Sequence, residues 1–147
     1  MGTYLTQVIA SAVLAVLLWL MIGTYARACT ALAFYMDSLV YVLVGMLIAY
    51  VVVAVMSSDS LILKMNETGI YKSLNDALGY AMVISLGAVI LNLVFYFHFA
   101  FKAWPIVNLE SVESIVFLLL LFISNLALLF FLTVITKLVQ ISRLRLA

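Results

Sequence analysis

Long apolar stretches separated by short polar ones make up almost the whole chain. The four apolar stretches cover residues 8–26, 31–56, 77–101 and 114–136. A helix of about 20 apolar residues crosses the hydrocarbon core of a bilayer, which is about 30 Å thick. Each stretch meets or nearly meets that length. The pattern therefore predicts an all-α integral membrane protein, with four transmembrane helices arranged as two antiparallel hairpins.

The composition favours the same class. Of the 147 residues, 69% are hydrophobic and 9% are charged, and the mean hydropathy is +1.35. A soluble domain carries about 25% charged residues, and a water-soluble fold of this size cannot hide so much apolar surface. The longest polar stretch, residues 57–76, is too short for a separate soluble domain. We therefore expect residues 1–147 to form a single transmembrane domain that contacts the lipid bilayer.

The distribution of lysine and arginine predicts the orientation in the membrane. Five basic residues lie on the side that holds the N-terminus, the linker 57–76 and the tail 137–147, namely Lys64, Lys72, Lys137, Arg143 and Arg145. The opposite side has two, Arg27 and Lys102. Because basic loops stay inside, both termini and the linker are predicted to be cytoplasmic, in a multi-pass protein of the cell's inner membrane.

The linker 57–76 is the most informative polar segment. Asp59 or Ser60 is suited to cap a short cytoplasmic helix that Gly69 would end. One interpretation is a docking surface for a cytoplasmic protein, and the other is a plain connector. The candidate docking residues in the linker and the basic tail are Lys64, Glu67, Tyr71, Lys72, Arg143 and Arg145.

Several chemically active residues lie near the predicted outer face. Arg27 is expected to end the first helix and Asp37 to lie near the start of the second, so an ion pair between them would anchor the hairpin. His98 lies one turn before Lys102 and is interpreted as an interfacial histidine. Cys29 is the single cysteine, so it cannot form an intramolecular disulfide.

Two amides lie deep in the predicted spans. Asn92 is nine residues from Phe101, and Asn125 is eleven residues from Ser114. At about 1.5 Å per residue their depths differ by about 3 Å. We expect them to hydrogen-bond to each other or to their copies in an oligomer, at about 0.6 kcal/mol per bond. The alternative is that they line a polar path together with Ser85.

Small residues at helical spacing predict close contacts between helices. The candidates are Ser11 and Ala15 in the first span, and Gly79 and Gly87 in the third. Such faces are more numerous than one four-helix bundle requires, so we expect a homo-oligomer.

The sequence shows no pattern typical of catalysis, metal binding or cofactor binding. It has one histidine and contains no CxxC, HxxE or GxSxG. We therefore expect a protein that is not an enzyme and needs no cofactor or metal. The net charge of +1, without a basic patch, also gives no reason to expect nucleic-acid binding.

The predicted layout consists of two hairpins joined by the linker 61–74, which contains Thr68-Gly69-Ile70-Tyr71. Across the whole chain this layout resembles the small four-pass membrane components of bacterial antiphage defence systems, Kiwa-like ones among them. The resemblance implies an inner-membrane oligomer that senses perturbation of the envelope and recruits a cytosolic effector.

Three functions remain open at this point. The first is a non-enzymatic oligomeric scaffold or sensor that docks a cytoplasmic partner, for example in bacterial antiphage defence. The second is a holin-like or toxin-type channel lined by Asn92, Asn125 and Ser85. The third is a small exporter of the drug-resistance type. Such exporters need a carboxylate in the first span, and residues 8–26 contain none.

Overall fold

The computed structural model describes residues 2–56 and 59–146, and these form five helices. They are α1 (Gly2–Met21), α2 (Tyr25–Met56), α3 (Asp59–Glu67), α4 (Ile70–Lys102) and α5 (Ser111–Leu146). All but α3 are long and apolar enough to cross a membrane. The predicted all-α fold with four transmembrane helices and a short linker helix is therefore confirmed.

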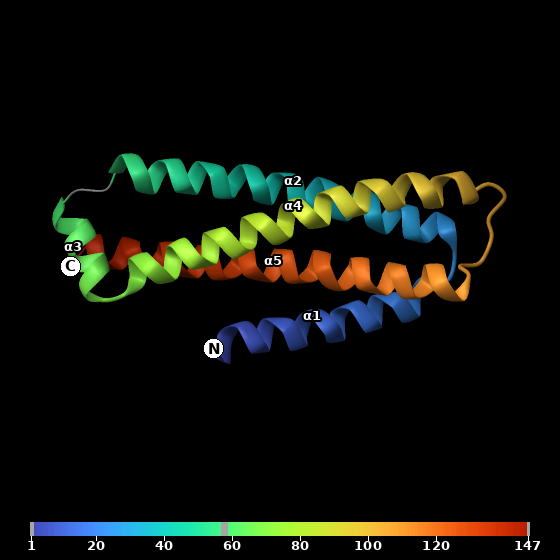
Figure 1. Cartoon of the computed structure of the whole chain (residues 1–147), viewed down its shortest axis with the longest axis horizontal. Helices are drawn as coiled ribbons and strands as arrows, with labels where there is room; N and C mark the ends of the chain where they lie inside the picture. The colour runs from blue at the N-terminus through green and yellow to red at the C-terminus, as the bar shows by residue number, and fades with distance from the viewer. Residues whose placement is uncertain (1, 57–58, 147) are drawn as a thin grey trace.

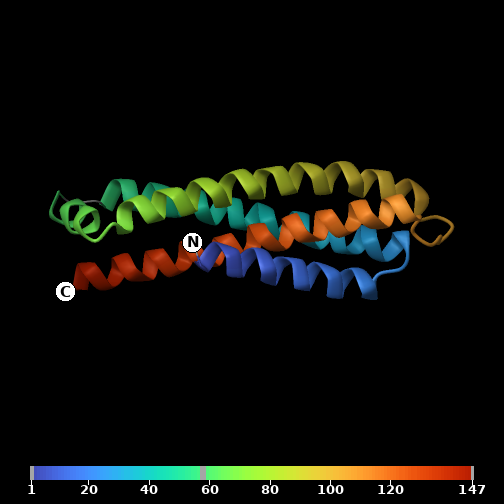
Figure 2. The ribbon, with the colours of Figure 1, turned by 60° about the horizontal axis from the view of Figure 1, so that its bottom comes forward.

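The four long helices lie lengthwise in an elongated bundle of two antiparallel hairpins (Figure 1). The central helix is α5, which packs against α1, α2 and α4, while α2 and α4 pack along each other. The first helix packs along α5 and not along α2, to which a short turn joins it, as Figure 2 also shows. One side of α2 is therefore left without a neighbour.

The helices differ in length in a way that sets the two ends of the bundle apart. Helix α1 has 20 residues, whereas α2, α4 and α5 have 32, 33 and 36. At about 1.5 Å per residue, α1 spans about 30 Å and the others are about 18–24 Å longer. The N-terminus of α1 lies part-way along the bundle, and the other three helices run past it (Figure 1). We call the end that carries α3 the α3 end, and the opposite end the loop end.

Side-chain contacts locate the beginning of α1 against its neighbours. The ring of Tyr4 lies 6.0 Å from the ring of Tyr80 on α4 and 5.5 Å from that of Phe130 on α5. Gln7 donates a hydrogen bond to the backbone oxygen of Leu129 at 3.1 Å. The part of α4 before Tyr80 and the part of α5 after these contacts therefore extend beyond α1 toward the α3 end.

Helix α2 buries one continuous face. The buried residues follow one another at alternating spacings of three and four, and are Tyr25, Ala28, Leu32, Tyr35, Leu39, Val42 and Met46. This spacing keeps one side of a helix against its partners over many turns, as in a coiled coil. The face packs against α4 and α5 and leaves the opposite side of α2 exposed.

The first turn lies nearer the N-terminus than predicted. Helix α1 ends at Met21 and α2 begins at Tyr25, so Arg27 lies in the first turn of α2 and does not end α1. Hydropathy cannot locate this turn, because the residues on both sides of it are apolar. The long helices α4 and α5 also continue beyond the apolar stretches, since a helix does not end where the bilayer does.

The two loops of the loop end are joined by backbone hydrogen bonds. The N–H of Tyr25 donates to the oxygen of Val107 at 3.1 Å, and the N–H of Leu109 donates to the oxygen of Gly23 at 3.3 Å. The first of these satisfies a backbone donor that the start of α2 leaves open. This short bridge links the first hairpin to the second.

The turn between α3 and α4 is made by a glycine, as predicted. Gly69 has a φ of 69°, in the left-handed region that glycine adopts most readily. Its N–H donates to the backbone oxygen of Asn66 at 3.2 Å. Gly69 therefore ends α3 and redirects the chain into α4.

Candidate functional site

Asn92 of α4 is bonded to α5 in the middle of the bundle. Its Nδ2 donates to Ser124 Oγ at 2.8 Å and to the backbone oxygen of Ala88 at 2.7 Å. Both Asn92 and Ser124 are fully buried. This bond between side chains joins the two longest helices at mid-depth.

Asn125 has a different partner from the one predicted. Its Oδ1 accepts a hydrogen bond of 2.7 Å from the hydroxyl of Tyr35 on α2. The direct bond between Asn92 and Asn125 is therefore not formed, although their depths agree. Successive helical residues are rotated by about 100°, so Ser124 faces α4 while Asn125 faces α2. We call Tyr35, Asn92, Ser124 and Asn125 the amide layer.

The amide layer lies inside a single bundle. Asn125 is 6% exposed, and Ser85 and Asn92 are not exposed at all. Asn92 Oδ1, Asn125 Nδ2 and Ser85 Oγ are buried without a hydrogen-bond partner in the described part of the chain. These side chains therefore lie inside one bundle, and not on an outward surface where copies would meet.

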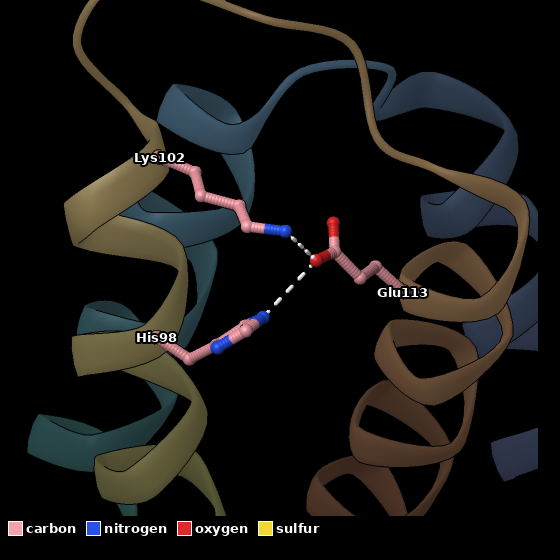
Figure 3. Close-up of polar contacts among 3 residues, drawn as sticks. All are labelled: His98, Lys102 and Glu113. Carbon is pink, nitrogen blue, oxygen red and sulfur yellow. Dashed lines mark hydrogen bonds and ion pairs between the residues drawn. The ribbon is translucent and has the colours of Figure 1, made fainter.

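A charged cluster closes the loop end. Glu113, in the first turn of α5, accepts a hydrogen bond from Lys102 and lies 3.0 Å from His98 Nε2 (Figure 3). Its side chain is only 13% exposed, and the start of a helix favours a negative charge. Lys102 Nζ also lies 5.5 Å from the ring centroid of Tyr25. The cluster therefore ties α4 to α5 and to the start of α2.

Sequence reasoning placed His98 and Lys102 near this surface but did not identify their common partner. Their spacing of four residues puts both on one side of α4, which is a signal for a shared acceptor. Glu110 and Glu113 were both available at the start of α5, and only the tertiary structure shows that Glu113 is the partner.

The predicted docking residues gather at the α3 end. Lys64 and Glu67 lie on α3, Tyr71 and Lys72 lie in the first turn of α4, and all four are exposed. Helix α3 packs against both α4 and α5, which brings the exposed Arg143 of α5 to the same end. Arg145 lies on the last turn of α5, and its side chain falls outside the described residues.

The four predicted packing residues divide into two pairs. Ser11 and Ala15 are buried on α1, the helix that packs along α5. Gly79 and Gly87 lie in open positions, since a Cβ added at either would meet no atom within 4 Å. Within one bundle, Ser11 and Ala15 therefore lie at a contact between helices, whereas Gly79 and Gly87 do not.

Asp37 lies deeper than predicted. It is twelve residues after Tyr25, the first residue of α2, and therefore about 18 Å from the loop end. Arg27 lies on the same helix, about 15 Å away along its axis, so the predicted ion pair is wrong. Tyr35 bonds to Asn125 only two residues before Asp37. The carboxylate therefore lies at the depth of the amide layer, which would be near the centre of a hydrocarbon core about 30 Å thick that begins at the loop end.

Asp37 faces outward at that depth. It is exposed on α2, and within the described residues its carboxylate has no hydrogen bond or ion pair. An aspartate at the centre of a membrane helix costs about 2.5–3.5 kcal/mol on insertion scales, and such residues usually serve a function. The other charged residues of the spanning helices lie toward their ends.

Comparison with known proteins yields no match: no family model, curated protein or solved structure is similar to the chain. In the described ranges no group of three or more His, Cys, Asp or Glu residues is placed to hold a metal ion. The features that distinguish the molecule are therefore the α3 end, the amide layer and the outward carboxylate of Asp37.

Proposed function

We propose that the chain is a non-enzymatic, oligomeric scaffold or sensor subunit of the inner membrane, and that its α3 end docks a cytoplasmic protein. The observation that carries the proposal is the length of α4 and α5, which have 33 and 36 residues and carry the exposed Lys72 and Arg143 at the α3 end (Figure 1). A bundle built only to cross a membrane needs about 20 residues in each helix.

The chemistry of the α3 end supports docking. Helices α4 and α5 are about 50–54 Å long, whereas the hydrocarbon core and both headgroup layers together measure about 40–45 Å. Exposed basic side chains stand on three different helices at this end, Lys64 on α3, Lys72 on α4 and Arg143 on α5. With the exposed Glu67 and Asp76 they form a surface of mixed charge, which fits a cytoplasmic protein of complementary charge pattern.

The resemblance in layout to antiphage membrane components suggests which stimulus the protein would sense. We propose that perturbation of the envelope acts on the transmembrane helices, and that the α3 end transmits the change to a cytosolic effector. Helix α1 packs along α5, whose other end reaches the α3 end, so movement of α1 has a physical route to the docking surface.

Photo-crosslinking from the two ends of the bundle tests the docking proposal. A photoreactive amino acid at Glu67 on α3 should capture one cytoplasmic protein in native membranes, in a fixed ratio to the chain by mass spectrometry. The matched control is Trp104 at the loop end, which is 89% exposed and should capture none of it. The combined Lys64→Glu and Lys72→Glu variant should lose the capture. The same proteins captured from both ends would overturn the proposal.

One observation favours a second candidate, the small exporter. Asp37 supplies a carboxylate at mid-depth, although it lies in α2 and not in the first span. Under this candidate, inverted vesicles should take up tetraphenylphosphonium against its gradient, and the Asp37→Asn variant should not. Uptake that is equal in vesicles with and without the protein would remove this candidate.

A further inference from the structure

The exposed side of α2 forms a regular stripe opposite its buried face. Its members follow one another at spacings of four and three residues, and are Thr30, Phe34, Asp37, Tyr41, Val44 and Ile48. Each of them comes two residues after a member of the buried face, which corresponds to about 200° around the helix. We call this set the α2 outer stripe, and Asp37 lies near its middle.

The outward face of α4 provides an uncharged comparison within the same molecule. It has the same spacing and is formed by Tyr80, Val83, Gly87, Ile90, Val94 and Phe97. None of these residues carries a charge, as hydrocarbon requires. The α2 outer stripe differs from it by a single carboxylate, and lipid tails cannot satisfy that group.

The stripe also carries a hydrogen-bond donor. Tyr41 follows Asp37 by one turn and is 77% exposed, and its hydroxyl has no partner among the described residues. Long side chains on a helix lean toward its N-terminus, so the ring of Tyr41 reaches back toward the depth of Asp37. The stripe therefore presents an acceptor and a donor at similar depth, and no described residue of the chain bonds to either.

Within the described residues, no helix covers the stripe at its loop-end side. An apolar groove with a volume of about 560 Å³ opens between α1 and α2, and its lining includes Arg27, Thr30 and Phe34. It exists because α1 packs along α5 and leaves α2 free. The surface beside Asp37 is therefore open to another helix.

We propose that the α2 outer stripe is the interface between two copies of this chain, in which Asp37 of each copy accepts a hydrogen bond from Tyr41 of the other. Two copies inserted in the same direction place equal residues at equal depth, and a two-fold axis makes both bonds equivalent. The alternating spacing of three and four suits a left-handed pair of helices. This inference rests on the proposal that the protein is oligomeric, and it assigns the contact between copies to the outer side of α2.

Disulfide crosslinking distinguishes the stripe from the lipid-like face of α4. In a Cys29→Ser background, Val44→Cys lies on the stripe, and the matched control Val94→Cys lies on α4 with similar exposure. Under mild oxidation in native membranes, the Val44→Cys chain should form disulfide-linked dimers and the Val94→Cys chain should not.

Variants of Asp37 test the polar contact within that assay. Asp37→Leu should lower the dimer association constant about tenfold, because both reciprocal bonds are lost. Asp37→Asn should retain the dimer, since an amide both donates and accepts hydrogen bonds. Position 37 faces outward, so the bundle should keep its helical content in both variants, which circular dichroism checks.

Three results would overturn the interface. The first is that the Val94→Cys chain crosslinks as much as the Val44→Cys chain. The second is that Asp37→Leu leaves the crosslinking of Val44→Cys unchanged. The third is that the Val44→Cys chain stays monomeric or crosslinks to a different protein. Capture of a cytoplasmic protein from Glu67, followed in the same membranes, separates this inference from the docking proposal. Capture without the dimer overturns only the interface, and the dimer without capture overturns only docking.

Discussion

Asn92 on α4 donates a hydrogen bond of 2.8 Å to Ser124 on α5, and both side chains are fully buried at mid-depth. Neither group can turn to water in a bilayer, so the bond sets the rotation of α4 relative to α5 about their axes. The amide layer built around it supplies two hydrogen bonds between side chains of different helices, Asn92 to Ser124 and Tyr35 to Asn125.

The first prediction concerns this pair. A double-mutant cycle with Asn92→Ala and Ser124→Ala should give a coupling free energy of about 0.6 kcal/mol, and no more than about 2 kcal/mol. The measurement is the free energy of reversible unfolding in mixed detergent micelles. Strictly additive single changes would show that the bond contributes nothing.

The second prediction concerns Tyr35 and Asn125. Tyr35→Phe should lower the free energy of unfolding by about 1 kcal/mol or more, because Asn125 Oδ1 then stays buried without a donor. Adding Asn125→Leu should restore most of the loss, since both polar partners are then replaced by apolar groups. A double variant that is less stable than Tyr35→Phe alone would contradict this account.

The third prediction concerns the cluster at the loop end. Glu113→Gln should lower the free energy of unfolding by about 1 kcal/mol at low salt, because Lys102 and His98 lose the negative charge of their common partner. The loss should shrink at 1 M salt, where exposed charges are screened within about 3 Å. Glu110→Gln is the matched control, as Glu110 is exposed and forms no ion pair within the described ranges. An equal loss in both variants would argue against the cluster.

The fourth prediction concerns three glycines with different backbones. Gly79→Ala and Gly87→Ala should each raise the free energy of unfolding by about 0.5–1 kcal/mol, because both glycines are helical and a Cβ meets no neighbour. Gly69→Ala should lower it by about 1–2 kcal/mol, since its φ of 69° suits only glycine without strain. Thermal unfolding of the three variants measures these changes in stability. A loss of stability in Gly79→Ala or Gly87→Ala would contradict the open space around these glycines, and a gain in Gly69→Ala would contradict its strained backbone.

The sequence by itself determined the membrane class, the number of spanning helices and the linker helix. A span needs about 20 apolar residues with every backbone group satisfied internally, so length and composition leave little choice. Gly69 marked the end of α3 for a similar local reason, its freedom to adopt a positive φ. The depths of Asn92 and Asn125 also followed from counting residues along each helix.

The tertiary structure alone decided which side chains meet. Asn92 bonds to Ser124 and Asn125 to Tyr35, because contact depends on the rotation of each helix about its axis and not on depth. The depth of Asp37 depends on where α2 begins, and that start is joined by a backbone bond to Val107 of the other hairpin. The apolar sequence around a turn does not reveal such a distant contact. The outward position of the Asp37 carboxylate at mid-depth is therefore visible only in the folded chain.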